Sequence, residues 1–565
     1  MTKQQRKQTM IAGALTGTAG IFLTKLMGLV YVIPFQAMAG SQTVFYSYAF
    51  TIYDYCLQIC LGGFPFALAT LVAKYMAKDD HATVMVIRRI ASLVMGIFGV
   101  ISCGALIMFS RTAAGMIIPD TVPASEYSYY IATTQTVLII VAFALLFVPI
   151  LSFYRGFYQG MRDMRVYART QVLEQLIRVA FLLGAGALCY YVLDMDQIWT
   201  VYMAVASTSI AAVGSIIYFI FYDRRHIGEV TASMPADRRP LSGKAVFKEL
   251  MAYAIPYFIA AIITNSSSMF VLLMFASGMQ AYGTDGVQIT VLQGLIDYQS
   301  AKLTMIPQIF ASGFALALVP HITTALTLGD EKGARDLVTK ALDMVNYLAV
   351  PVVAFMAVFA REIFYVMYGA YHLDDGASIL SKALLLMLLL IFVTVLQSIL
   401  LSMRMQKAYV IIDTVELAFI LLTFHYFLAH LGVNGYFLVY AVKYLIFIAA
   451  SLYLIVGRTN LRLRPLAERF GQAWVGCLPM LLLAAALDWG HYDVTSGSRL
   501  VTLAVIAVLG LITMAGYLLI TGRFGLPQYL FGIELTPAGI KGLINRIIHP
   551  SQQDETGVEN PSDSE

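Results

Sequence analysis

The sequence has little charge, few cysteines and almost no tryptophan, and the shortage of charge is the most informative. Only 12% of its 565 residues are Asp, Glu, Lys or Arg, whereas 59% are hydrophobic. Soluble domains carry about 25% charged residues, so the composition excludes an ordinary soluble protein. The five cysteines have no metal-ligand spacing and suggest no disulfide framework. We expect them to pack as small hydrophobic side chains.

Common signatures of catalysis are also missing. The sequence contains no P-loop, no GxSxG motif, no HExxH motif and no cluster of cysteine and histidine. The net charge of +4 says little by itself. We therefore expect a protein that is not an enzyme, carries no cofactor and binds no nucleic acid.

Long hydrophobic runs dominate the chain, and its mean hydropathy is +0.76. A hydropathy pass predicts an all-α polytopic membrane protein with 14 transmembrane helices. The apolar run after Lys3, Arg6 and Lys7 is too long for a signal peptide. The expected spans are 9–36, 42–76, 83–110, 127–154, 167–193, 198–222, 247–276, 299–326, 336–360, 377–403, 408–430, 433–457, 470–490 and 498–521.

Basic and acidic residues alternate between successive connections. Arg165 and Arg169 follow the fourth expected span, whereas Asp194 and Asp196 follow the fifth. The positive-inside rule then places both termini in the cytoplasm. The longest polar cytoplasmic stretch, 223–246, is expected to be a linker between two halves.

An internal repeat supports two halves of like construction. At an offset of 250, Gly63, Phe64, Ala67, Leu68 and Asp80 match Gly313, Phe314, Ala317, Leu318 and Asp330. At an offset of 242, Arg162, Arg165, Tyr167 and Glu174 match Arg404, Lys407, Tyr409 and Glu416. Six spans separate the matches, so the halves share their orientation and a pseudo-twofold axis lies along the membrane normal. Two unrelated helical bundles are the alternative.

The repeat predicts the organisation of an alternating-access transporter, with two six-helix lobes and two extra helices. The expected parts are an N-lobe (1–222), the linker (223–246), a C-lobe (247–457), the two extra helices (458–521) and an amphipathic cytoplasmic helix with a disordered acidic tail (522–565).

Charged residues inside the expected spans are the candidate site residues. Each costs about 2.5–3.5 kcal/mol at the bilayer centre, so such residues are rare without a function or a partner. Glu174 and Arg178 are one helical turn apart and can pair. For each residue alone, a structural ion pair is as good an interpretation as a ligand contact. Together they predict a hydrated cavity with a positive bias at Lys25 and Arg178, suited to a diphosphate headgroup. The expected headgroup-binding residues are Lys25, Asp54, Glu174, Arg178, Lys302 and Lys443, and the gating or cation candidates are Asp413, Glu416 and Asn265.

Four stretches resemble the SpoVB/YtgP branch of the MurJ-like lipid II flippases, in the multidrug/oligosaccharidyl-lipid/polysaccharide (MOP) exporter superfamily. They are GTAGIFLTKLMGLVYVIPF (17–35), GGFPFALATLVAKYMAKDD (62–80), RGFYQGMRDMRVYARTQVLEQLIRV (155–179) and FALALVPHITTALTLGDEKGA (314–334). The resemblance implies the MATE-like fold, with a V-shaped cavity between the lobes. It also implies a groove for a polyprenyl tail at the last two spans.

Individual residues match the family pattern to different degrees. Lys25 stands where the family has a basic residue expected to meet the diphosphate, and Glu174 and Arg178 match its EQxxR motif. Asp413 stands where some members have a cation ligand. The span-seven acid of sodium-binding members is replaced by the Asn265–Ser268 stretch, so coupling to a monovalent cation or a proton stays open.

With this cavity, the resemblance implies a flippase that moves undecaprenyl-diphosphate-linked lipid II from the inner to the outer leaflet of the bacterial cytoplasmic membrane. The expected partners are this lipid-linked oligosaccharide, membrane lipids and cell-wall synthesis proteins. The alternatives are a flippase for another lipid-linked unit of the teichoic acid or capsule type, a multidrug antiporter and a scaffold without transport activity. An acidic and aromatic cavity would favour the antiporter.

Overall fold

The computed structural model describes residues 27–28, 31–76, 78–161, 163–232, 240–308, 322, 325–326, 329–403, 405–489 and 497–531, and it has no strand within them. Eleven helices in these ranges are long and apolar enough to cross a membrane. The prediction of an all-α polytopic membrane protein is therefore confirmed. The number of 14 spans is not confirmed: the first and eighth expected spans extend beyond the described ranges, and the second, 42–76, is not among the eleven.

The helices fall into two groups and a C-terminal set. The first group comprises α2 (Val32–Ala39), α3 (Thr43–Met76), α4 (His81–Ile117), α5 (Ala124–Gly160), α6 (Met164–Ala187) and α7 (Gln197–Ala232). The second comprises α8 (Gly243–Tyr282), α9 (Gly286–Gly294), α11 (Glu331–Val358), α12 (Ala360–Tyr368), α13 (Leu373–Ser402), α14 (Gln406–Leu431) and α15 (Val433–Thr459). The C-terminal set comprises α16 (Leu463–Gly476), α17 (Leu478–Trp489), α18 (Arg499–Arg523) and α19 (Leu526–Phe531).

Aspartate side chains start several helices by capping them. Asp80 accepts a hydrogen bond from the backbone N–H of Thr83 at the start of α4, and Asp330 accepts one from Gly333 at the start of α11. Such a cap satisfies an N–H group that has no partner within its own helix. Asp80 and Asp330 are matched in the internal repeat. The two halves therefore use the same device at equivalent positions.

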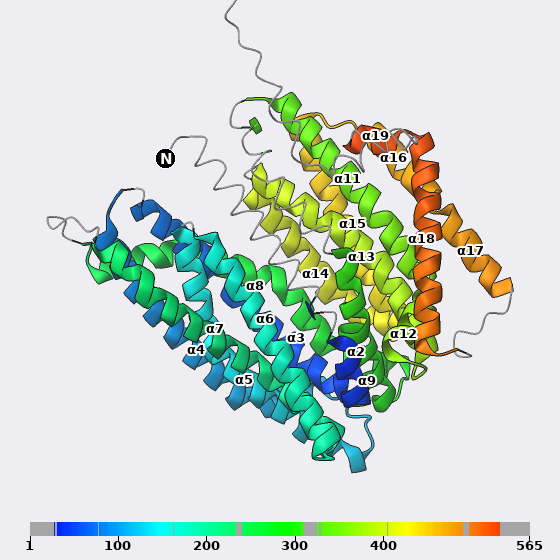
Figure 1. Cartoon of the computed structure of the whole chain (residues 1–565), viewed down its shortest axis with the longest axis horizontal. Coiled ribbons are helices and arrows are strands. Elements are labelled where there is room, and N and C mark those ends of the chain that lie inside the picture. Colours follow the sequence, from blue (N-terminus) through cyan, green and yellow to red (C-terminus); the bar gives the residue numbers. More distant parts are fainter. Residues whose placement is uncertain are drawn as a thin grey trace, which may run out of the picture.

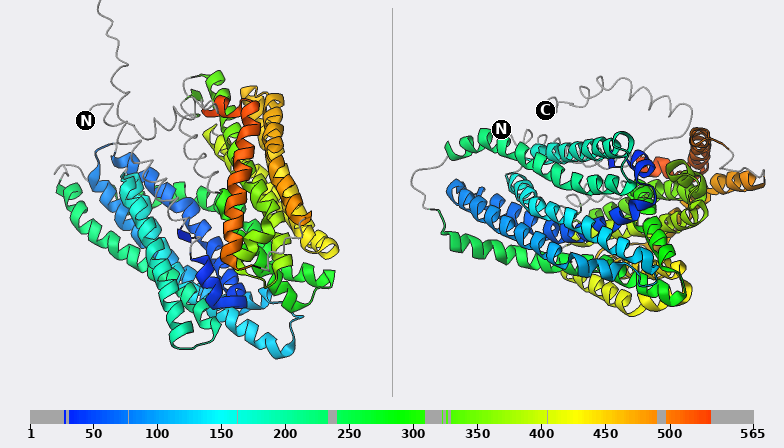
Figure 2. Two further views of the ribbon diagram at one scale, coloured as in Figure 1. Left: turned by 45° about the vertical axis from the view of Figure 1, so that its right-hand side comes forward. Right: turned by 90° about the horizontal axis from the view of Figure 1, so that it is seen from below.

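The two groups of helices converge towards the end of the molecule at which α2, α9 and α12 lie, and separate towards the other end (Figures 1 and 2). Helix α8 contacts α3 of the first group and α14 of the second. Helices α16 and α18 pack against each other beside α11 and α12. The C-terminal set thus covers one side of the second group (Figure 1).

Helices α3 and α5 approach closely because α5 presents glycines to α3. A Cβ on Gly156 would lie 2.8 Å from the Cα of Pro65, and one on Gly160 would lie 2.8 Å from the carbonyl oxygen of Ala69. Small residues of this kind let membrane helices pack backbone against backbone. This contact brings the backbones of α3 and α5 together in the core of the first group.

Several expected boundaries differ from the observed helices. The eighth span was expected from residue 299, but its helix already begins at Gly286 and continues through a π-helical segment, η3 (Leu295–Ser300). The expected linker, 223–246, is shortened because α7 extends to Ala232 and α8 begins at Gly243. The expected amphipathic helix, 538–549, lies outside the described residues.

The close approach of α3 and α5 predicts that a side chain at position 156 destabilises the protein. We expect Gly156→Val to lower the free energy of unfolding by about 1–3 kcal/mol through overpacking. Gly104→Val on α4 is the matched control, because a Cβ there meets nothing within 4 Å. Thermal unfolding in detergent checks this, and equal destabilisation by both variants would contradict it.

Candidate functional site

A cavity of about 500 Å³ lies between the two groups of helices. This volume is within the range of small-molecule binding sites, about 300–1,000 Å³. Its wall is formed by α3, α8, α13, α15 and the helix that begins with α9. The charged side chains in the wall are Asp54, Asp297 and Lys302, the amides are Gln58, Asn265 and Gln308, and the tyrosines are Tyr46, Tyr55, Tyr298, Tyr436, Tyr440 and Tyr444.

Lys302 joins the two groups of helices at this cavity. Its Nζ donates a hydrogen bond to the hydroxyl oxygen of Tyr31, just before α2, at 3.2 Å. The same ammonium lies 5.5 Å from the ring centroid of Tyr31 and 5.8 Å from that of Tyr298. Aromatic faces attract a cation at such distances. Lys302 therefore points towards the aromatic side chains between the two groups of helices.

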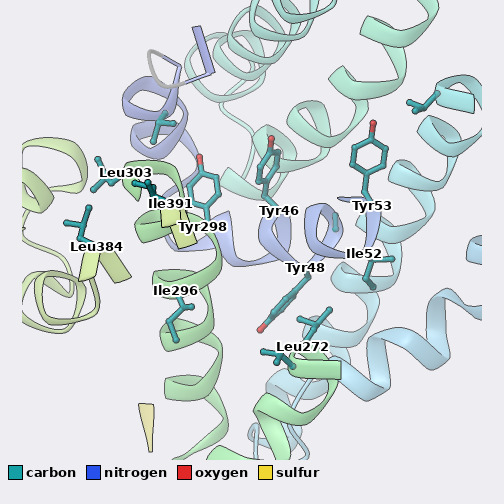
Figure 3. Packing of buried hydrophobic residues seen from close by; sticks show 14 of the residues in the cluster. Tyr46, Tyr48, Ile52, Tyr53, Leu272, Ile296, Tyr298, Leu303, Leu384 and Ile391 are labelled. Carbon is teal, nitrogen blue, oxygen red and sulfur yellow. The ribbon is translucent and has the colours of Figure 1, made fainter. Parts of the chain in front are cut away.

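Aromatic rings surround this lysine and hold the groups together. The ring of Phe35 lies 5.1 Å from that of Tyr46 and 6.0 Å from that of Tyr298, and the rings of Tyr46 and Tyr298 are 5.5 Å apart. Figure 3 shows the side chains of Tyr46 and Tyr53 on one side of α3 and that of Tyr48 on the other. We call Tyr31, Phe35, Tyr46 and Tyr298 the aromatic contact. It links α2 and α3 to η3.

The charges in the wall differ from the expected positive bias. Asp54 is exposed to the cavity and close enough to Lys302 for their charges to interact. Within the described part of the chain, the wall carries one ammonium group and two carboxylates. Lys25, which was expected to contribute positive charge, lies outside the described residues.

The predicted pair of Glu174 and Arg178 is confirmed and belongs to a larger network. Glu174 lies 2.5 Å from Arg178 and 2.6 Å from Arg155 of α5. Arg178 also donates a hydrogen bond to Gln175 at 3.1 Å. None of these residues is in the described cavity wall. The network joins α5 to α6, which favours the structural interpretation of the pair.

A second buried charge cluster lies on α14 and α15. The exposed fractions of Asp413 and Glu416 are only 8% and 4%, so both carboxylates are buried within the second group of helices. The Nζ of Lys443 lies 3.8 Å from Glu416 and 5.6 Å from the ring centroids of both Tyr440 and Tyr444. Those two tyrosines line the cavity, whereas the three charged residues do not. Lys443 thus supplies the positive charge beside the buried carboxylate.

Asn265 lines the cavity, but its amide nitrogen donates to the carbonyl oxygen of Ala261 at 2.8 Å. The hydroxyl of Ser266 likewise donates to Ile262 at 2.6 Å. Much of the polar capacity of this stretch therefore serves its own helix. Among the described residues, no group of three His, Cys, Asp or Glu side chains could hold a metal ion.

Asp297 is the wall residue that the hydropathy pass missed. It lies on η3, two residues before the expected start of the eighth span. A span placed on the apolar run from about Val287 onward would have contained Asp297 and so would have made it a candidate site residue. The acid lowered the hydropathy of this run, and the span was placed after it.

Comparison with a solved structure defines the class of fold. The chain superimposes on the lipid II flippase MurJ in an inward closed conformation with a TM-score of 0.63 and 12% identity, over 90% of this chain and 99% of that one. The expected MurJ-like transporter fold is therefore confirmed.

The sequence comparisons define the family. The model for the family "Polysaccharide biosynthesis protein" matches residues 10–326, and the chain belongs to that family. The lipid II flippase MurJ of Bacillus subtilis (strain 168) is 30% identical over 66% of this chain and 68% of its own length. Stage V sporulation protein B of the same organism is 24% identical over 67% of this chain and 70% of its own length. With its apolar helices, the chain is a multi-pass bacterial membrane protein.

The network around Glu174 predicts a large loss of stability when its carboxylate is removed. We expect Glu174→Ala to cost about 3–5 kcal/mol, because Arg155 and Arg178 would stay buried without their counter-ion. The control is Glu468→Ala, which breaks the exposed pair with Arg464 and should cost about 0–1 kcal/mol. Thermal unfolding in detergent measures both, and a cost for Glu174→Ala no larger than the control's would show that the network does not stabilise the fold.

Proposed function

We propose that the protein is a flippase that moves lipid II from the inner to the outer leaflet by alternating access. One relative and one solved structure support this proposal: the MurJ relative is named as a lipid II flippase, and so is the superimposed structure. The undecaprenyl tail stays in the lipid while the headgroup passes through the cavity. The protein then acts in the cytoplasmic membrane, with both termini in the cytoplasm and with cell-wall synthesis proteins as partners, and it is not an enzyme.

The position of Lys302 is the observation that carries the proposal. An ammonium group is a compact charge that binds phosphate oxygens. Here it lies on a cavity between two groups of helices and also contacts Tyr31 of the opposite group. A diphosphate that binds the Lys302 ammonium competes for it with the Tyr31 hydroxyl and with the rings of Tyr31 and Tyr298. Headgroup binding therefore weakens a contact that holds the groups together, which is the differential interaction that a conformational change requires.

The other candidate residues take supporting roles in this proposal. Asp54 keeps Lys302 oriented while the cavity is empty, and Lys25 is a second diphosphate ligand. Arg178 is close enough to Tyr46, which lines the cavity, and to Tyr53 for its charge to act on both. Glu174 fixes Arg178 in that place. Lys443 acts as an internal cation for Glu416 and Asp413, which keeps α14 and α15 together during rocking.

Removing the Lys302 charge tests the proposal. We expect Lys302→Ala to lower lipid II flipping at least about tenfold, because a hydrogen bond to a charged group contributes about 1.5–3 kcal/mol. Lys302→Arg should retain part of the activity. The control is Lys382→Ala, which removes a hydrogen bond to Asn434 outside the cavity wall. The measurement is rescue of bacteria depleted of their own lipid II flippase, at equal protein levels. Full rescue by Lys302→Ala would overturn the assigned role.

A flippase for another lipid-linked polysaccharide unit is the second candidate. The description of the matched family model favours it, since it concerns polysaccharide biosynthesis in general. The cavity would bind the same diphosphate. Failure of the wild-type protein to rescue the depleted bacteria, at normal membrane levels, would favour this candidate.

The acidic and aromatic wall is the feature that favours a multidrug antiporter. Asp54 and the tyrosines could bind an amphiphilic cation. An antiporter predicts that expression lowers susceptibility to cationic drugs and that Asp54→Asn abolishes this effect. We expect unchanged susceptibility with both proteins, which growth assays across a panel of cationic drugs would measure.

A further inference from the structure

Asp297 is a carboxylate that lies mostly inside the protein, partly exposed at the cavity wall, and that the proposed transport cycle does not use. It lies on η3, where the π-helical geometry interrupts the regular helix between α9 and residues 301–308. Segments of this kind are frequent at functional sites. The side chain of Asp297 faces both the central cavity and a side pocket of about 10 Å³. That volume is at the lower limit for a single water molecule.

The charge of Asp297 has no counter-ion among the described residues. No ion pair involves it, although Lys302 is five residues further along the same helix. The ammonium of Lys302 instead contacts Tyr31. A buried carboxylate without a positive partner is unfavourable in its ionised form.

The groups that face Asp297 from the surrounding helices are neutral. Tyr48 of α3 and Tyr436 and Tyr440 of α15 are close enough to interact with its charge. Helices α8 and α13 contribute apolar side chains to the pocket walls beside it, among them Leu272 and Leu386. None of these neighbouring groups supplies a positive charge to the carboxyl group.

Gln293 provides the observation that points to a proton. It lies one turn before Asp297, lines the same side pocket and is only 2% exposed. Its carbonyl oxygen, Oε1, is buried in the side pocket without a hydrogen-bond partner. A protonated Asp297, which lines the same pocket, carries the O–H that would supply a donor to Oε1. An unpaired acceptor of this kind costs free energy that a single O–H group would recover.

We propose that Asp297 and Gln293 form a proton-binding site at the interface of the two groups of helices. Binding adds one proton to the carboxylate, and the resulting O–H donates to Oε1 of Gln293. The amide and the carboxylic acid then share two reciprocal hydrogen bonds. No other bond forms or breaks, and the charge of the site changes from −1 to zero.

The site couples protons to movement because Tyr48 approaches it from the opposite group of helices. The neutral acid fits the closed interface, and the carboxylate fits an interface that is open to water. A proton taken up from one side of the membrane and released on the other would therefore bias the rocking of the two groups. This coupling rests on the proposed transport function, whereas proton binding itself does not.

Infrared difference spectroscopy of the full chain in lipid nanodiscs tests the site without any lipid-linked cargo. We expect a pH step between 5 and 9 to change the carbonyl-stretch band of a protonated carboxylic acid, and we expect Asp297→Asn to remove that change. Gln293→Leu should shift the band to higher frequency, because the carboxyl group loses hydrogen bonds. Asp54→Asn, in the same cavity but exposed to it, is the control that should leave the band in place.

Three results would overturn the proposal. An Asp297→Asn spectrum identical to that of the wild type at every pH would mean that no titrating acid is present there. A band that Asp297→Asn removes but that does not change with pH would mean a permanently protonated structural acid. Loss of the band on adding sodium at constant pH would mean that the site binds a metal ion. The infrared measurement uses no lipid II and does not depend on the outcome of the flipping assay. A failure of the proton-site proposal can therefore be told apart from a failure of the proposed function.

Discussion

The structure depends on one constraint: a charge in the interior of a membrane protein needs a counter-ion, an aromatic face or water. The buried charges meet this need in three ways. Glu174 is paired with two arginines, and Glu416 lies beside Lys443. The ammonium of Lys302 donates a hydrogen bond to the Tyr31 hydroxyl and lies over the rings of Tyr31 and Tyr298. Asp54 is exposed to the cavity. The first arrangement holds helices together, and the other two place charge where a ligand can reach it.

Some of these arrangements occur at positions that the internal repeat matches between the two halves of the chain. Glu174 and Glu416 are matched in the repeat, and both form ion pairs with basic residues inside their own group of helices. The partners differ, because Glu174 uses an arginine on its own helix and another on α5, whereas Glu416 uses a lysine on α15. The matched caps Asp80 and Asp330 are more alike. The two halves are thus most similar at the helix caps, where a side chain bonds a backbone N–H group. They are less similar in the ion pairs between helices.

Much of the fold could be predicted because hydrophobic runs and charge alternation are local signals. The helical class, the family and the Glu174–Arg178 pair follow from residues close together in the sequence. The partners of Lys302 could not be predicted, because Tyr31 is distant in sequence and only tertiary packing brings it near. Asp297 was missed for a different reason. Hydropathy treats an acid as the edge of a span, whereas a π-helical segment holds this one within a helix.

The glycine contact between α3 and α5 also determines where the molecule can deform. With Gly156 and Gly160 against the backbone of α3, those two helices cannot slide past each other without a clash. In the proposed transport cycle, α3 and α5 would then move together. Helix α8 contacts α3 on one side and α14 on the other, so it is attached to both moving bodies. If the two groups of helices rotate relative to each other during transport, α8 must bend, because its two ends of contact would move apart. Helix α8 would then store elastic strain during the conformational change.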